Sequence, residues 1–159
     1  LEFRRVLFRS RLGKAGEPVI TNDAAPFEFG KVRLIREGRD ALVLGYGPTL
    51  KMGVDAAVAM EAKGMSVAVA SVHTLKPLDR EGIARLLHRF PRVVVLEEMV
   101  PHGGLAGMVK EVAWDSAARC RISALTLKDE FVHLYGSHAG LLAAHGISLP
   151  ALTRALSEG

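Results

Sequence analysis

The stretch ALVLGYG at residues 41–47 is a run of apolar residues that ends in a pair of glycines. Such a run is typical of a buried strand that enters a tight turn. Similar apolar runs return at residues 66–73, 92–98 and 121–127, and amphipathic stretches of helical period separate them. Strands that alternate with helices imply right-handed crossovers and a mostly parallel sheet with helices on both faces. The sequence therefore predicts an α/β fold, a three-layer α/β/α sandwich.

The helices between these runs have recognisable ends. Residues 52–63 predict a helix that Gly64 ends, with an apolar face of Val54, Ala57, Val58 and Met60. Later helices have side chains suited to capping their first turns, namely Asp79, Ser137 and Ser148. The segment from Lys76 to Asp79 is then explained as a connector from strand to helix and needs no chemistry.

Residues 29–36 (FGKVRLIR) alternate between apolar and polar types, as a strand does. They lead through Glu37 and Gly38 into the run at residue 41. So short a connection favours a hairpin-like antiparallel pairing with that run. We therefore expect one antiparallel edge strand beside the parallel ones.

The length and texture of the chain indicate a single domain. Its 159 residues suffice for one domain of ordinary size. Residues 1–10 (LEFRRVLFRS) differ abruptly in character from the residues after them, and we interpret them as an adapter-derived artefact. Residues 11–28, with glycine, proline and asparagine, are predicted to be a linker, and residues 29–159 the domain itself.

Composition excludes several classes of protein. The formal net charge is +4, of which the first ten residues, with three arginines and one glutamate, supply +2. No basic stripe with interleaved aromatic residues remains, so nucleic-acid binding is not indicated. No apolar run reaches the roughly 18 residues that a membrane helix needs. The single cysteine, Cys120, excludes an internal disulfide framework and fits a cytoplasmic setting. Its arginine neighbours could lower the pKa of its thiol, but a passive, half-buried cysteine is the stronger interpretation.

The most unusual segment is EEMVPHGG at residues 97–104. Two carboxylates end a buried strand there, and a pair of glycines opens a helix. The carboxylates could act as acid and base if their surroundings separated their pKa values. Successive strand residues point to opposite faces, however, so only one of them can enter a given crevice. A structural or interface role is the stronger interpretation for these candidates: Glu97, Glu98, His102, Gly103 and Gly104.

The turn Gly45-Tyr46-Gly47 is the second candidate for a ligand site. A dinucleotide fingerprint would need a third glycine where Leu50 stands, so a tight turn between strand and helix explains these glycines adequately. A stand-alone nucleotide-binding protein remains an alternative. The six histidines have no metal-ligand spacing, and we expect no metal site.

Four segments in order resemble the C-terminal domain of the transketolase superfamily. They are FEFGKVRLIREGRDALVLGYG (27–47), SVHTLKPLD (71–79), VVVLEEMVPHGGLAG (93–107) and DEFVHLYGSHAGLLAAHGIS (129–148). The chain is most similar to the C-terminal subunit of split, two-gene transketolase-like proteins. HTLKPLD followed by GGLAG favours that group. The family often has histidine after the paired glutamates, where this chain has Met99.

This resemblance implies an enzyme that uses thiamine diphosphate and Mg²⁺ to transfer two-carbon ketol units between sugar phosphates. It implies that domains absent from this chain hold the coenzyme and the metal, so the chain would be an inactive fragment without catalytic residues. Its role would be architectural, with an N-terminal transketolase subunit and a second copy of the chain as partners. Arg11 corresponds to an arginine that faces the substrate phosphate, a task that suits a guanidinium.

Two relatives of this family stay open as alternatives. One is the C-terminal domain of a deoxyxylulose-phosphate synthase. The other is the last domain of a 2-oxo acid dehydrogenase beta subunit, which docks an acyltransferase. An exposed apolar patch rimmed with charge near residues 97–104 would favour docking.

Overall fold

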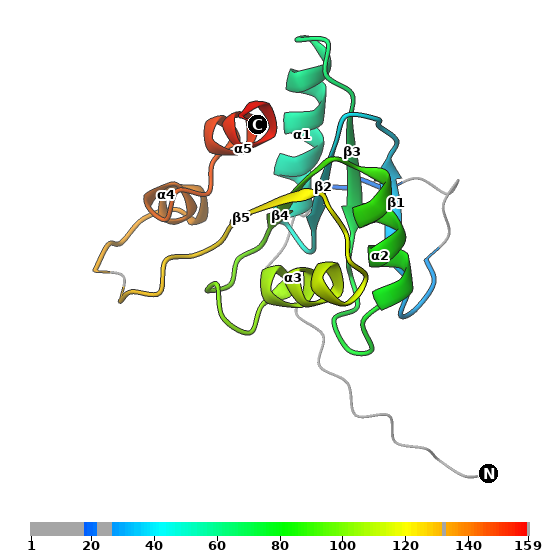
Figure 1. Ribbon diagram of the computed structural model, residues 1–159. Coiled ribbons are helices and arrows are strands. Elements are labelled where there is room, and N and C mark those ends of the chain that lie inside the picture. Colours follow the sequence, from blue (N-terminus) through cyan, green and yellow to red (C-terminus); the bar gives the residue numbers. More distant parts are fainter. Residues whose placement is uncertain (1–17, 22–26, 132, 159) are drawn as a thin grey trace, which may run out of the picture.

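The computed structural model describes residues 18–21, 27–131 and 133–158 of the chain. Within these ranges, five strands form one sheet in the order β1-β3-β2-β4-β5 (Figure 1). Strands β2 to β5 run parallel to one another, and β1 pairs antiparallel with β3 at one edge. The bounds are Arg33–Arg36 for β1, Ala41–Gly45 for β2, Val67–Ser71 for β3, Arg92–Leu96 for β4 and Arg121–Leu125 for β5. The predicted sheet is confirmed.

Helices cover both faces of this sheet (Figure 1). On one face lie α1, α4 and α5, and on the other lie α2 and α3. Their bounds are Thr49–Glu61, Arg80–Arg89, Leu105–Asp115, His138–Ala144 and Leu149–Ser157 for α1 to α5 in turn. The predicted α/β/α sandwich is therefore confirmed. None of the helices formed by the described residues has the length and apolar character that crossing a membrane requires.

Alternate side chains of the central strands divide the core into two halves. Val43 and Val69 pack with α1 and α5, whereas Leu42, Leu44 and Val95 pack with α2 and α3. Every residue of β2 and β3 is buried. Strands covered on both faces need apolar residues at successive positions, which is why these runs do not alternate.

The helix ends mostly follow the expected signals. Side-chain oxygens of Asp79, Ser137 and Ser148 accept hydrogen bonds from backbone N–H groups in the first turns of α2, α4 and α5. Gly64 follows α1 with a φ of +82°, a conformation that favours glycine. Helix α1 begins at Thr49 rather than near residue 52. Val58 was predicted on its buried face, but its side chain is 52% exposed.

The predicted partner of the antiparallel strand is wrong. Strand β1 pairs with β3, not with β2, and it spans Arg33–Arg36 rather than residues 29–36. Both edges of β2 are occupied by the parallel neighbours β3 and β4. A short connection favours a hairpin only when the next strand has a free edge. Here β3 and β4 occupy both edges of β2, so β1 pairs with the outer edge of β3 instead.

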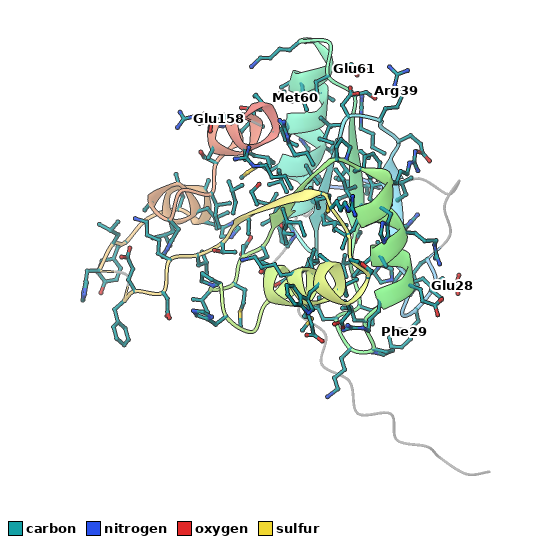
Figure 2. The ribbon with its side chains drawn as sticks, viewed as in Figure 1. Glu28, Phe29, Arg39, Met60, Glu61 and Glu158 are labelled. Carbon is teal, nitrogen blue, oxygen red and sulfur yellow. The ribbon has the colours of Figure 1, made fainter. Side chains whose placement is uncertain are left out.

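The connection from β1 to β2 passes over the start of β3. The backbone N–H groups of Arg39 and Asp40 both donate to Ser66 O, at 3.0 and 2.8 Å. Gly38 makes the crossing possible, because a Cβ there would lie 2.2 Å from Ala68 N. Figure 2 shows Phe29, which precedes β1, and Arg39, which precedes β2, at opposite ends of the sheet.

Candidate functional site

The candidate residues lie where β2 and β4 end side by side. These strands are parallel neighbours, with Gly45 opposite Leu96. The turn at Tyr46 and the glutamate pair at residues 97–98 therefore meet at the carboxyl edge of the sheet. Open α/β sheets bind their ligands at this edge. The geometry at this position decides what the glutamates can do.

The Glu97 side chain is fully buried and caps α3. Its carboxylate accepts hydrogen bonds from Leu105 N at 2.7 Å and Ala106 N at 2.8 Å. The Tyr46 hydroxyl donates to the same carboxylate at 3.3 Å. A negative charge at a helix N-terminus is stabilised by the peptide dipoles. Glu97 thus joins the ends of β2 and β4 to the start of α3.

Gly104 is required at this position for a steric reason. A Cβ there would lie 2.5 Å from Glu97 Oε2, closer than side-chain atoms approach one another. Gly103, the preceding residue, has a φ of +79°. The two glycines predicted as site candidates therefore let α3 begin directly against the buried carboxylate.

Glu98 points to the other face of the sheet, as alternation along a strand requires. Its Oε2 lies 3.0 Å from His138 Nε2 at the start of α4. Glu98 and His138 line a pocket of about 420 Å³ beneath α4 and between α1 and α5. The other lining residues are mainly apolar and include Met52, Leu142, Ile147 and Leu149.

The other predicted site residues, His102 and Arg11, are not placed in contact with Glu97 or Glu98. His102 is exposed in the loop that leads to α3. Arg11 lies outside the described residues, as do residues 1–10 and most of the predicted linker. The sequence interpretation missed two partners that the fold supplies: Tyr46, which donates to Glu97, and His138, which contacts Glu98. Tyr46 reaches Glu97 because β2 pairs with β4, and His138 reaches Glu98 because the chain returns to this edge of the sheet at α4.

The glycine turn after β2 does not fit a diphosphate. A Cβ at Gly45 would meet Leu96 O at 2.8 Å, so the backbone of β4 fills the space beside it. The Thr49 hydroxyl, which follows the turn, donates to Tyr46 O at 2.8 Å. Among the described residues, no group of three or more histidine, cysteine or carboxylate side chains is placed to hold a metal ion.

Asp79 fastens β1 to the start of α2. Its carboxylate accepts from Val32 N at 2.9 Å and from Gly82 N at 3.0 Å, and Lys31 Nζ lies 3.8 Å away. Burial raises the pKa of this carboxyl, but the two hydrogen bonds and the cations outweigh burial and hold the pKa below its ordinary value. The predicted connector role of this segment is confirmed.

Cys120 is the one free cysteine of the described chain, and it is half-buried. Burial raises the pKa of its thiol. This direction favours the passive interpretation over activation of the thiol by the neighbouring arginines.

Comparison with known proteins gives one family. The description "Transketolase, C-terminal domain" fits residues 30–151. Among curated relatives, the 1-deoxy-D-xylulose-5-phosphate synthase of Rhodopirellula baltica is 33% identical over 149 residues, which are 93% of this chain and 23% of that protein. The synthase of Pelotomaculum thermopropionicum is 32% identical and covers 82% of this chain and 20% of the relative.

Two transketolases are among the solved structures that resemble the chain. One is described as "Split gene transketolase, inactive beta4 tetramer"; it aligns with 92% of this chain and 47% of its own at a TM-score of 0.82 and 26% identity. The other is the transketolase of Campylobacter jejuni, with a TM-score of 0.54 and 16% identity over 79% of this chain and 18% of its own. The second likeness extends to the fold alone.

Proposed function

The chain belongs to the family of transketolase C-terminal domains, and on that premise we propose that it is the subunit-contact domain of a thiamine-diphosphate-dependent, transketolase-type enzyme. The complete enzyme would transfer two-carbon ketol units between sugar phosphates. The chain spans about a fifth of the length of the curated relatives, 23% and 20% of the two named above. Residues 29–159 would be the domain, and residues 11–28 the linker to a pyrimidine-binding domain.

The observation that carries this proposal is the use of Glu97. Its carboxylate is occupied by three donors that hold α3 against the sheet. At the edge where α/β proteins usually bind ligands, the carboxylate of Glu97 therefore holds the domain together. Other domains would hold thiamine diphosphate and Mg²⁺, and Arg11 would face the substrate phosphate from the linker.

The partners would be an N-terminal transketolase subunit and further copies of this chain. The solved structure with the TM-score of 0.82 is described as a tetramer of beta chains. Since 92% of this chain aligns with that protein, we infer that this chain also contacts its own copies. Active sites assembled between subunits would then depend on this domain for their spacing.

Deoxyxylulose-phosphate synthesis is the second candidate activity. The relatives named above are synthases of this kind, at 33% and 32% identity. The split transketolase, whose fold extends along 92% of this chain at 26% identity, supports the first candidate, while the sequence relatives support this one. The two candidates share the same role for this domain and differ in the substrates of the whole enzyme.

Two measurements test the proposal. The complete enzyme, with any partner subunit, is assayed for ketol transfer between sugar phosphates and for formation of 1-deoxy-D-xylulose 5-phosphate. Turnover in the first assay supports the transketolase assignment, and turnover in the second supports the synthase. Inactivity in both assays, with the coenzyme bound, would refute the enzyme assignment. Calorimetric titration of this chain alone with thiamine diphosphate and Mg²⁺ should give no heat of binding. Tight binding would contradict the proposal that other domains hold the coenzyme.

A further inference from the structure

We propose that three exposed side chains between β5 and α4 form the surface through which this domain contacts a second copy of itself. The residues are Phe131, Leu134 and Tyr135, named here the aromatic loop. This inference rests on the proposed function, because it identifies the surface that a subunit-contact domain would use.

The exposure of these side chains has no explanation within the domain. Phe131 is 92% exposed, Leu134 is 61% exposed and Tyr135 is fully exposed. Single exposed apolar residues are ordinary, but three within five positions are not. Both halves of the core are filled by other residues. Phe131 and Tyr135 therefore add almost no buried area to this domain, and Leu134 is only partly covered by it.

The two ends of the loop are fixed to the domain. At its start, Leu127 N donates to Met99 O at 2.9 Å, and Lys128 N donates to His145 Nδ1 at 3.0 Å. At its end, Ser137 caps α4, and His138 Nε2 lies 3.0 Å from Glu98 Oε2. Figure 1 shows the segment between β5 and α4 leading away from the sheet beyond the β5 edge. Because the ends are anchored, less conformational entropy is lost when the loop binds a partner.

The area of the loop fits a symmetric contact with a second copy. In a two-fold interface the same patch faces itself, so two loops contribute six apolar side chains. Together these carry on the order of 1,000 Å² of surface, which approaches the roughly 1,200 Å² at which specific interfaces begin. Met99, 39% exposed and hydrogen-bonded through its carbonyl to Leu127 at the root of the loop, adds further apolar area. Exposed aromatic residues of this kind are the usual anchors of protein interfaces.

Charge beside the loop is compatible with this occupant. Lys128 and Glu130 lie 3.6 Å apart and neutralise one another within one copy. The other carboxylate of this segment, that of Asp129, is exposed to solvent. A self-contact would place the paired charges of Lys128 and Glu130 and the carboxylate of Asp129 around the apolar side chains, where charged and polar residues are usual.

The test compares two variants by sedimentation velocity over a hundredfold range of protein concentration. In Phe131→Ser/Tyr135→Ser the anchors are removed. In the matched control Trp114→Ser, an equally exposed aromatic residue (87%) is removed near the end of α3, away from the carboxyl edge. We expect the unaltered chain and the control to associate with rising concentration, and the double variant to need at least tenfold more protein. Circular dichroism spectra should be the same in all three proteins, and so should the melting temperatures at concentrations where all three are monomeric, because neither site is buried within the domain.

Three results would overturn the proposal. Association of the double variant at the same concentrations as the unaltered chain would place the contact on another surface. Weaker association of the Trp114 control would do the same. A monomeric unaltered chain throughout the range would mean that the loop serves a different partner, such as an acyltransferase or a second subunit type. None of these results affects the activity assays of the complete enzyme, so failure of the proposed function would be seen separately.

Discussion

Replacing Glu97 by glutamine should destabilise the domain by about 3 kcal/mol. The carboxylate accepts hydrogen bonds from Leu105 N and Ala106 N at 2.7 and 2.8 Å. Hydrogen bonds to charged groups contribute about 1.5–3 kcal/mol each, and a buried N–H left without an acceptor costs about 1–3 kcal/mol. Glutamine keeps one acceptor oxygen and the volume, but its NH₂ group faces one of the two donors. The loss of negative charge at the helix N-terminus adds about 0.3–1 kcal/mol.

The matched control is Glu98→Gln, one residue further along the chain. The Glu98 side chain is 20% exposed and its partner His138 is 61% exposed, so solvent screens this pair and glutamine should cost less here than at the fully buried Glu97. Urea unfolding followed by circular dichroism gives the free energies of both variants. For a chain of 159 residues, the Glu97 variant should melt roughly 6–12 °C lower. Equal stability of the two variants would refute the capping role of Glu97.

A double-mutant cycle isolates the steric part of the same contact. Gly104→Ala should be strongly destabilising, because the new Cβ would lie 2.5 Å from Glu97 Oε2. In a Glu97→Ala background the clash is absent, so the same substitution should cost much less. Additive effects, within about 0.5 kcal/mol, would mean that the two residues do not interact.

Further predictions concern other positions. Gly38→Ala should prevent stable folding, since its Cβ would lie 2.2 Å from Ala68 N, whereas Gly136→Ala, with open space around it, should change the urea midpoint little. Asp79 has a lowered pKa in the folded state, so the stability it contributes is present above its unfolded pKa, about 3.9. That stability is lost as the pH falls through the folded value. Asp79→Asn should therefore flatten the dependence of unfolding free energy on pH below about pH 4. Cys120, whose pKa is raised by burial, should react with iodoacetamide more slowly at pH 8 than a free thiol does, and a faster reaction would contradict the passive assignment.

The sheet could be predicted from the sequence because residues that begin or end helices stand between the apolar runs. Gly64, Asp79, Ser137 and Ser148 all act through contacts within a few residues, and such contacts are visible in the sequence. The pairing of β1 could not be predicted, because it depends on whether the edge of β2 is free. That edge is filled by β3, a strand that comes later in the chain.

The glutamate pair was predicted correctly in one respect. Alternation along the strand separates Glu97 and Glu98, so they face different sides of the sheet. Their partners could not be predicted, because Tyr46 and His138 lie some fifty and forty residues away in the sequence. Neither spacing is a motif; both partners are brought into place by the stacking of whole elements.

The strand order has a consequence for the growing chain on the ribosome. Strand β2 is central in the sheet, yet both of its neighbours, β3 and β4, are synthesised after it. Until residue 96 has emerged, at least one side of this wholly apolar strand has no neighbour to pair with. Chaperones should therefore bind most strongly to nascent chains that stall before that point, because unpaired apolar strands promote aggregation.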